Sequence, residues 1–471
     1  MPEATMVQRL AAFAVRCRDS PLPPEPAADV TGRVLDVIGN CLAGLAEESA
    51  SAVLSMVRAW SGTPQAALFG EAGKLPAPNA ALFNGTLAHA LDFDDTHLPS
   101  ILHPSASVVP AALAAAEEAG AGGPALTAAV AAGIEICDRL GMASYLPELR
   151  NSAFFERGQH ATSICGTLGS AAAAALLYDL DTEGVASAMG IAASMGAGVI
   201  EANRTGGTVK RVHCGWAAHA GVTAASLARA GVTGPPTVLE GRFGFFQAWL
   251  GGTYDEHALL DGLGERWETL RTVYKPYPSN HFTHPAIDCA LALRAGGLDP
   301  DDIVEIELGV PTPTLRTIAE PRPDKVRPRT PYHAKFSGPF TVAVALLGGG
   351  GLGVYLDDFT ENTLTDPRHL ALADRVSCVA DPEASAIFPT AFAAVLRVRT
   401  TRGATLEHRV ASSRGGPTTP LTRAELLTKF RLNAERALPP HQVDRLATTV
   451  ASLPTTTTAA TISEQARPAP A

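Results

Sequence analysis

The densest group of side chains that could do chemistry lies in residues 92–103. It supplies three carboxylates and two imidazoles in an otherwise apolar context, namely Asp92, Asp94, Asp95, His97 and His103. Unpaired charges are expensive to bury, so a group of this kind is usually either exposed to solvent or functional. The residue types alone leave two interpretations open: an exposed helix end followed by a proline turn, or a site for acid–base chemistry.

Two further polar segments accompany predicted helices. His160 leads directly into a small-residue helix, whose positive N-terminal end can attract an anion; a structural cap is the alternative interpretation. Residues 203–213 place Arg204 and Lys210 on either side of a glycine pair. This loop is basic in an acidic chain, but it lacks the GKT or GKS ending of a phosphate-binding loop, so we do not expect nucleotide binding. A solvated surface loop is the alternative here.

A fourth polar segment, residues 274–285, stands where the texture of the sequence changes. Its prolines restrict the backbone and hold Lys275, His281 and His284 in a more fixed relation. We expect the segment to line a cleft between two domains, where binding sites commonly form. A structural linker between the domains is the alternative.

The elements that must position these segments have two different patterns. Up to about residue 260 the chain is alanine-rich, and apolar residues recur at helical spacing, as in residues 31–47. Residues 303–308 alternate apolar and polar side chains, as a half-exposed strand does, and residues 394–410 have the pattern of a hairpin turning at Thr401-Arg-Gly403. Helical patterns return near the C-terminus.

These patterns predict a mainly α protein with a large all-helical domain and a smaller α+β domain. We place the helical domain at residues 1–269, completed by residues 413–453, and the α+β domain at residues 270–412. Residues 454–471 lack apolar periodicity and are expected to be a disordered tail.

Composition and charge exclude several classes of protein. The 471 residues are 46% hydrophobic and 18% charged, which suits a large core rather than a disordered chain. A net charge of −10 argues against a general nucleic-acid binder. There is no apolar run long enough to span a membrane and no signal-peptide pattern, so we expect a cytoplasmic protein. The seven cysteines lack zinc-ribbon spacing and are expected to be buried free thiols.

Taken together, the polar segments resemble those of one enzyme family. The motifs are LDFDDTH followed by HPSA, then RGQHAT, GGTVKRVHCGWAAHAG, YKPYPSNHFTHPAID and YHAKFSGPF. In this order, from about residue 5 to residue 452, they resemble the MmgE/PrpD family, which contains 2-methylcitrate dehydratase, cis-aconitate decarboxylase and iminodisuccinate epimerase. The resemblance implies a helical domain joined to an α+β lid domain, a homodimer, and chemistry without a metal or an organic cofactor.

The resemblance also implies a set of site residues. Carried over by motif, these are Asp92, Thr96, His103, His160, Lys210 and Lys275, and the expected substrate-binding set further includes Arg204, Asn280, His281 and His284. This sequence departs from the family pattern at Asn280, where the decarboxylase branch has a histidine, so decarboxylation is disfavoured. Gln159 stands where the family often has an aromatic residue before its histidine, and the segment between Thr96 and His103 is one residue longer than in that branch.

The chemistry implied by this family begins next to a carboxylate. A base removes an α-proton, and the negative charge that builds up needs preorganised cations, for which Lys210 and Lys275 are the candidates. His103 and His160 can exchange protons near neutral pH, with Asp92 orienting His103 and Thr96 hydrogen-bonding the substrate. Sequence does not decide which histidine is the base. We predict a hydro-lyase that acts on a citrate-like di- or tricarboxylate such as 2-methylcitrate.

Three alternatives remain open at this point. The same scaffold could decarboxylate, isomerise or epimerise a related polycarboxylate. A metal-dependent hydratase or hydrolase could use as ligands Asp92, Asp94, His97 and His103. A binding protein could have kept the fold and lost the chemistry. The expected partners are a small polycarboxylate and a second copy of the chain, with neither nucleic acid nor membrane.

Overall fold

The computed structural model describes residues 4–148, 150–202, 207–456 and 458–468. The chain folds as two compact units. The first unit comprises Met1–Thr272 and Phe430–Ala471, and the second comprises Val273–Lys429. Helices outnumber strands throughout the described chain, which confirms the predicted mainly α fold.

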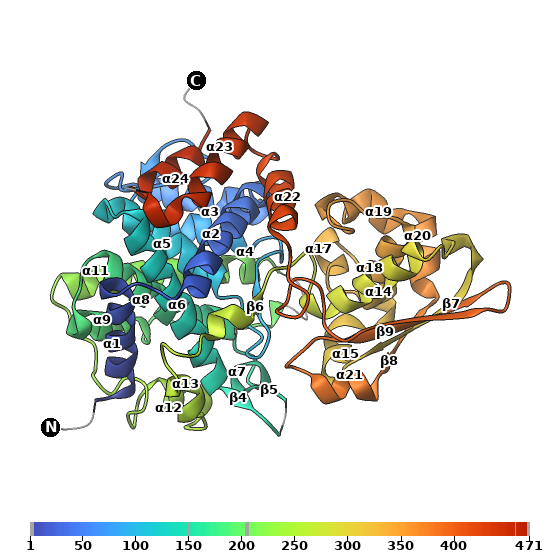
Figure 1. Ribbon diagram of the computed structural model, residues 1–471, viewed down its shortest axis with the longest axis horizontal. Helices are drawn as coiled ribbons and strands as arrows, with labels where there is room; N and C mark the ends of the chain where they lie inside the picture. Colours follow the sequence, from blue (N-terminus) through green and yellow to red (C-terminus); the bar gives the residue numbers. More distant parts are fainter. Residues whose placement is uncertain (1–3, 149, 203–206, 457, 469–471) are drawn as a thin grey trace. The chain divides into compact units, whose positions relative to one another are not determined.

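The first unit is built around five long helices that pack against one another (Figure 1). They are α4 (Ala77–His89), α5 (Ser105–Ala119), α6 (Gly123–Ala143), α8 (Ala161–Leu177) and α11 (His213–Arg229). Around them lie α1 (Met6–Asp19), α2 (Pro24–Gly44), α3 (Glu48–Trp60) and α9 (Thr182–Ala192). The helical periodicity of the first part of the chain therefore reports true helices, of which the central ones are buried on nearly every side.

Local sequence signals fix where several of these helices begin. Asp181 caps α9 by accepting a hydrogen bond from the Gly184 N–H at 2.9 Å, as its residue type predicts. Helix α4 carries Pro78 in its first turn, where a missing N–H costs nothing because no intrahelical acceptor faces that position. Both signals act within one turn of the chain.

Glycines allow the central helices to approach closely. An added Cβ at Gly85 of α4 would lie 2.8 Å from Gly215 Cα, and one at Gly215 of α11 would lie 2.2 Å from Leu82 O. Gly133 of α6 and Gly169 of α8 face each other in the same way. Because no side chain separates these backbones, polar groups at the helix ends are brought close together.

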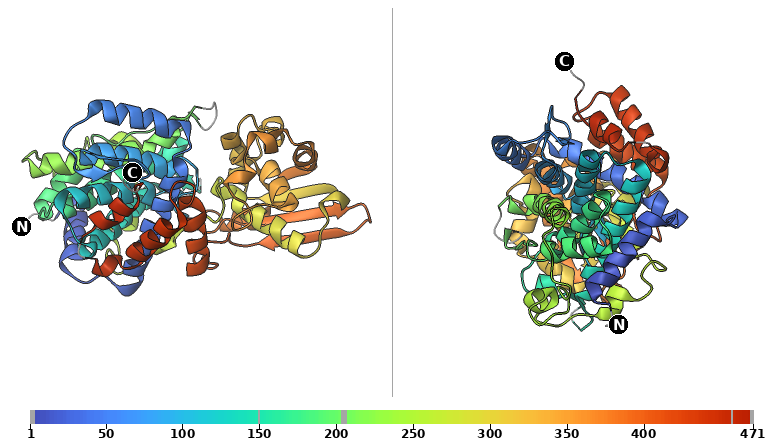
Figure 2. Two further views of the ribbon diagram at one scale, coloured as in Figure 1. Left: turned by 90° about the horizontal axis from the view of Figure 1, so that it is seen from above. Right: turned by 90° about the vertical axis from the view of Figure 1, so that its left-hand side faces the viewer.

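The C-terminal segment differs from the prediction in two respects. Residues 413–429 belong to the second unit rather than to the helical one. The described part of the expected disordered tail forms η7 (Leu453–Thr455) and α24 (Ala460–Gln465). Helix α24 packs against α23 (Pro440–Ala451) and α5, and the C-terminal helices are drawn in red in Figure 2.

The tail is ordered because it combines a few buried apolar side chains with backbone hydrogen bonds to distant residues. Ile462 is fully buried, and the Ala466 carbonyl accepts a hydrogen bond from the Gly70 N–H at 2.8 Å. Gln442 of α23 donates to the Gln465 carbonyl at 2.8 Å. These contacts join residues far apart in the sequence, so a search for local periodicity misses them.

The second unit contains a four-stranded sheet in the order β10-β9-β7-β8. The strands are β7 (Ile303–Val310), β8 (Val376–Ala380), β9 (Ala394–Thr400) and β10 (Thr405–Val410). Strands β7 and β8 are parallel and the other neighbours are antiparallel. The predicted hairpin is present as β9–β10, with Gly403 in the left-handed region at φ 79°.

Helices complete the core of the second unit. They include α14 (His284–Ala295), which packs on β9 and β10, and α18 (Gly338–Leu347), which packs on α14 and β8. Ile306 and Leu396 from the sheet and Phe340 from α18 are fully buried in this core. The α+β character expected after residue 270 is therefore present in this unit.

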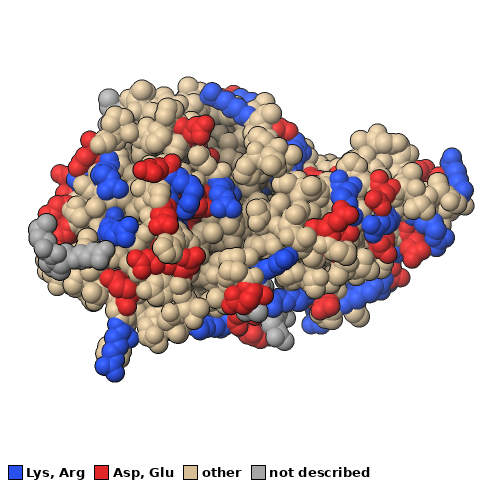
Figure 3. Space-filling view, turned by 60° about the horizontal axis from the view of Figure 1, so that its bottom comes forward, with Lys and Arg blue, Asp and Glu red and all other residues tan. Residues whose placement is uncertain are grey.

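Other features of the described residues concern the surface and the thiols. Basic and acidic side chains are interspersed on the face shown in Figure 3. No helix among the described residues is long and apolar enough to cross a membrane. All seven cysteines are free, and all except Cys378 are buried, as predicted.

The close contact at Gly215 leads to a stability prediction. We expect Gly215→Ala to lower the free energy of unfolding of the first unit by about 1–3 kcal/mol, because the added methyl group overlaps the α4 backbone. Gly296→Ala is the matched control, since its Cβ would come no nearer than 3.3 Å to any atom. Thermal unfolding followed by circular dichroism measures both, and an unchanged midpoint in Gly215→Ala would contradict this account of the packing.

Candidate functional site

Ionisable side chains that are buried, or partly buried in the case of His103, gather near the ends of the central helices of the first unit. We call this group the central cluster; it consists of His89, Asp92, Asp94, His103, His160, Lys210 and His213. His89 ends α4, His160 is the N-cap of α8, and His213 begins α11. The close approach of these helices brings together residues that are far apart in the sequence.

A buried ion pair joins two of the predicted site residues. The Lys210 ammonium, on η1 (Val209–Val212), donates to Asp92 Oδ1 at 3.0 Å, and both side chains are almost inaccessible to solvent. Asp92 has φ 55°, a left-handed conformation that aspartate adopts more readily than most residues. Each charge compensates the desolvation of the other, so removing one partner alone is costly.

Asp94 lies between two imidazoles. Its Oδ2 is 2.7 Å from His89 Nδ1 and 3.8 Å from His103 Nδ1. The sequence suggested Asp92 as the residue that orients His103, but Asp92 pairs with Lys210, and the carboxylate found near His103 is that of Asp94. The two carboxylates of this motif therefore have different partners: Asp92 pairs with Lys210, and Asp94 lies near His103.

His103 has a defined tautomer. Its Nδ1 contacts the Asp95 carbonyl oxygen, which can only accept, so Nδ1 carries a proton and Nε2 is the nitrogen that exchanges one. The hydroxyl of Thr96 is 3.4 Å from the same Nδ1, and the Thr162 hydroxyl accepts from the His103 backbone N–H at 3.2 Å. Thr96 therefore lies beside His103.

His160 and His213 face each other. Their Nδ1 atoms are 2.9 Å apart, and their ring centroids are 5.0 Å apart. Burial, and then the nearby His89 and Lys210, lowers the pKa of His160 well below its usual value. The same causes lower the pKa of His213 to about 4. Both rings are therefore neutral near pH 7.

A metal site is a poor fit to this cluster. His89, Asp94 and Cys214 place donor atoms within 4.8 Å of one another among the described residues. The 2.7 Å separation of His89 Nδ1 and Asp94 Oδ2 is that of a hydrogen bond, and burial keeps the pKa of the Cys214 thiol well above its usual value.

The metal ligands considered from the sequence are also divided. His97 belongs to a different buried network, in which its Nδ1 contacts Ser100 Oγ at 2.6 Å and its Nε2 lies 3.5 Å from Glu268 Oε2. Asp94 and His103 belong to the central cluster. His97 therefore belongs to this separate network and not to the central cluster.

The remaining predicted residues lie in the second unit or outside the described residues. Lys275 is fully buried in the second unit. Asn280 caps η3 (His281–Thr283) by accepting from the Phe282 N–H at 3.1 Å. His281 Nε2 is 3.2 Å from Ser413 Oγ, and His284 Nε2 donates to the Ser279 carbonyl at 3.1 Å. Arg204 lies outside the described residues.

Three members of the central cluster had no acid–base role assigned from the sequence. His89 and Asp94 are five residues apart on either side of a helix end, and His213 lies three residues after Lys210. The spacing of His213 after Lys210 within one basic motif was a usable signal. No local pattern indicates that His213 meets His160, which is 53 residues away.

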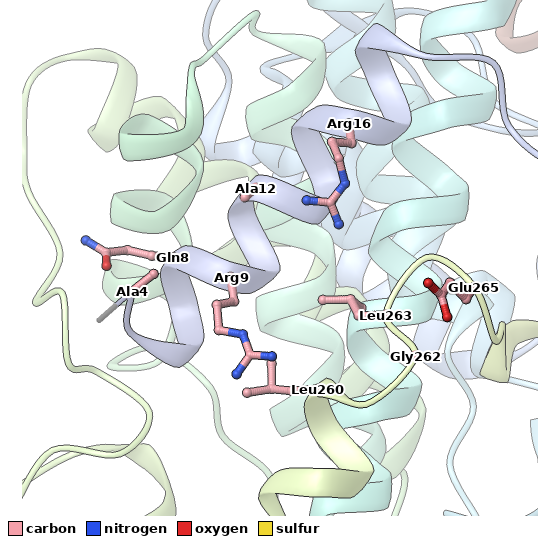
Figure 4. A pocket seen from close by; sticks show the side chains of 9 residues that line it. All are labelled: Ala4, Gln8, Arg9, Ala12, Arg16, Leu260, Gly262, Leu263 and Glu265. Carbon is pink, nitrogen blue, oxygen red and sulfur yellow. The ribbon is translucent and has the colours of Figure 1, made fainter. Parts of the chain in front are cut away.

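A surface pocket of about 370 Å³ lies elsewhere on the first unit (Figure 4). Arg9 and Arg16 of α1 line one side of it, and Leu263 and Glu265 line another. None of its lining residues belongs to the central cluster. The cluster, rather than this pocket, has the chemistry of a candidate active site.

Fold and cluster together define a mainly α protein whose helical unit buries a lysine–aspartate pair among imidazoles. Family comparison identifies the class. The MmgE/PrpD N-terminal domain model matches residues 8–257, and the MmgE/PrpD C-terminal domain model matches residues 277–455. The chain belongs to the MmgE/PrpD family, which confirms the resemblance seen in its motifs.

Three curated relatives are similar over most of their length. Cis-aconitate decarboxylase of Mus musculus is 28% identical over 432 residues, covering 89% of this chain and 85% of the relative. The Homo sapiens protein of the same name is 29% identical, with coverage of 89% and 86%. The cis-aconitate decarboxylase-like protein oryM of Aspergillus oryzae is 26% identical, with coverage of 96% and 95%.

The buried ion pair leads to a second stability prediction. We expect Lys210→Met to lower the free energy of unfolding by about 3–5 kcal/mol, because it removes the counter-charge that Lys210 supplies to buried Asp92. Adding Asp92→Asn should restore most of this loss, since asparagine is neutral and tolerates the left-handed backbone. Urea unfolding compares the variants, and a double variant no more stable than the single one would contradict the pairing.

The burial of His213 near His89 and Lys210 also predicts a pH dependence of stability. Since the folded-state pKa of His213 is about 4 against 6.5 in the unfolded chain, the unfolded chain binds protons first as the pH falls. The free energy of unfolding should therefore decrease from pH 6.5 towards pH 4, and less steeply in His213→Asn. Urea midpoints across this range measure the slope. Exposed His257→Asn is the control, and equal slopes in His213→Asn and wild type would refute the prediction.

Proposed function

We propose that the protein is a cofactor-independent lyase that removes an α-proton next to a carboxylate of a citrate-like di- or tricarboxylate. The observation that carries this proposal is the central cluster, in which a buried lysine lies among imidazoles with defined hydrogen-bond partners. A carbanion beside a carboxylate needs a fixed cation and a positioned base, and the cluster contains both. Family membership supports the same class of chemistry.

The residues have distinct roles in the proposed reaction. A substrate carboxylate would compete with Asp92 for the Lys210 ammonium and would be neutralised there as negative charge builds up. His160 is the proposed base, because a neutral imidazole has a lone pair to accept the α-proton. His103 is the proposed acid, since its Nδ1–H is held by the Asp95 carbonyl and its Nε2 is left to exchange a proton. Thr96 would hydrogen-bond the substrate. The cation role of Lys275, which lies in the second unit, stays a prediction from the family resemblance.

Dehydration is the reaction that we propose first. Loss of water requires a base for the α-proton and an acid for the departing hydroxyl, whereas decarboxylation requires only one proton delivered to carbon. The cluster offers two imidazoles with different hydrogen-bond partners, His103 on the Asp95 carbonyl and His160 on His213. Two separately positioned imidazoles suit a reaction with two proton transfers.

Decarboxylation of a cis-aconitate-like substrate is the second candidate. It is favoured by the names of the relatives, which cover nine-tenths or so of this chain. Asn280 weighs against it, because the family resemblance implies a histidine at that position in the decarboxylase branch. Isomerisation or epimerisation of a related polycarboxylate would use the same carbanion.

The cellular setting is part of the proposal. We propose a cytoplasmic homodimer whose ligand is a small polycarboxylate and which binds neither nucleic acid nor membrane. The net charge of −10 supports the exclusion of nucleic acid. Because the chain as a whole is acidic, an anionic substrate would be attracted by the cationic side chains near the site rather than by the net charge of the chain.

A substrate panel tests the proposed reaction. Chelator-treated full-length protein is incubated with 2-methylcitrate, citrate, cis-aconitate and iminodisuccinate, and products are read by mass spectrometry and chiral chromatography. Loss of water is expected from a citrate-like substrate. Release of CO2 would replace the hydro-lyase with the decarboxylase, and activity that returns only with added metal would overturn cofactor independence.

Variants of the central cluster test the site. We expect His103→Gln and Lys210→Ala to lower kcat by about 100-fold or more, because each removes a group that acts on the reacting atoms. His219→Asn on α11 and Lys74→Ala, an ion-paired lysine outside the cluster, are matched controls. Wild-type rates in either cluster variant, or equal losses in the controls, would contradict the assignment.

A further inference from the structure

The His160–His213 contact imposes a constraint on protons. Two Nδ1 atoms 2.9 Å apart can form a hydrogen bond only if a single proton lies between them. A neutral pair carries one N–H on each ring, so when His160 holds the shared proton, its Nε2 has a free lone pair and His213 is protonated at Nε2. When His213 holds the shared proton, the protonation of both Nε2 atoms is reversed.

The surrounding structure holds both rings in this arrangement. The backbone N–H of His160 donates to the Gly198 carbonyl at 3.0 Å, and Ser163 Oγ donates to the backbone carbonyl of His213 at 3.1 Å. A Cβ at Gly198 would lie 3.1 Å from His160 Cβ and 3.5 Å from His213 Nδ1. The backbone of Gly198 therefore lies close to both rings. Ser163, in the first turn of α8, bonds to the first residue of α11.

Positive charge on His160 would be unfavourable where it lies. His89 is 5.7 Å away by ring centroid, and Lys210 and His103 also act on His160 as neighbouring cations or potential cations. His213 is more accessible than His160, with 8% of its surface exposed against 2%. Burial, His89 and Lys210 disfavour charge on His213 as well, whereas His103 acts on His160 in addition. The more accessible ring of His213 is therefore the less unfavourable of the two positions for the accepted proton.

We propose that His213 is a positioning and relay residue that sets the tautomer of His160 and takes up the charge when His160 accepts a substrate proton. This inference builds on the proposed function. In the step, the substrate C–H bond breaks, its electron pair stays on carbon, and an N–H bond forms at His160 Nε2. The His160 Nδ1–H bond then breaks as an N–H bond forms at His213 Nδ1. His160 ends neutral and His213 ends as the imidazolium, and the reverse transfer resets the pair.

The decisive variant is His213→Asn, which keeps a hydrogen-bonding group near His160 Nδ1 but cannot accept a proton. With the substrate found in the panel, we expect kcat to fall about 100-fold with KM within about threefold of wild type. His219→Asn is the matched control on the same helix, where the ring contacts the Pro78 carbonyl at 3.0 Å and stacks on Trp216. It should retain wild-type kcat.

The result that overturns the relay is equally specific. A His213→Asn enzyme with kcat within about threefold of wild type would mean that His213 carries no proton in turnover. A rise in KM without a change in kcat would likewise reduce His213 to a structural role. Circular dichroism and thermal unfolding of His213→Asn and His213→Gln establish which variant is folded and therefore used.

A spectroscopic measurement on the wild-type chain does not depend on activity. In long-range proton–nitrogen correlation spectra of the full-length protein labelled with 15N-histidine, the Nδ1 protonation of His160 and His213 should sum to one, with assignments from His160→Gln and His213→Asn. Two rings that are both protonated only at Nε2 would exclude the shared proton. If no polycarboxylate reacts, the proposed function fails, and this spectrum still decides whether the pair shares its proton.

Discussion

Charge inside a helical core is tolerated only when it is paired, and the first unit is organised by this constraint. Lys210 and Asp92 are buried together, and each would cost several kcal/mol without the other. The imidazoles around them have buried hydrogen-bond partners, His89 with Asp94 and His160 with His213. The central cluster thus contains linked pairs, so removing one partner raises the free-energy cost of burying the other.

A second buried network is connected to the central cluster through Asp95. Arg33 is 2% exposed; it forms ion pairs with Asp29 and Asp95 and contacts the Thr272 carbonyl. Burial raises the pKa of Asp95 to about 6, although Arg33 opposes this shift. The backbone carbonyl of the same Asp95 holds the Nδ1 proton of His103. Asp95 therefore connects a structural network of arginine and carboxylates to a proposed catalytic imidazole, without itself being required to exchange a proton.

Small side chains explain how so many polar groups meet in a helical unit. The glycine contacts between α4 and α11 and between α6 and α8 bring backbones into direct contact. Helix ends carry backbone groups without intrahelical partners, so they are natural places for polar side chains and turns. Three of the cluster imidazoles, His89, His160 and His213, lie at such ends. The alanine-rich composition is therefore connected to the chemistry: it permits the packing that gathers these ends.

Local chemistry in the sequence determined a large part of this protein. Apolar periodicity predicted helices such as α2 and α8, alternation predicted β7, and Gly403 marked the turn of the hairpin, because each of these signals acts within a few residues. The order of its motifs was sufficient to indicate the family, and it identified segments that contribute four members of the central cluster with candidate roles.

Only the tertiary structure decided which groups meet: Lys210 reaches Asp92 across 118 residues, and His213 meets His160 across 53. Asp94 lies near His103 where the sequence suggested Asp92, because the left-handed turn at Asp92 directs that carboxylate to Lys210. The C-terminal helix α24 is ordered by burying Ile462 and by hydrogen bonds to residues far along the chain. The physical reason is the same in each case: helix periodicity and turn preference are properties of neighbouring residues, whereas pairing and burial depend on how distant helices pack.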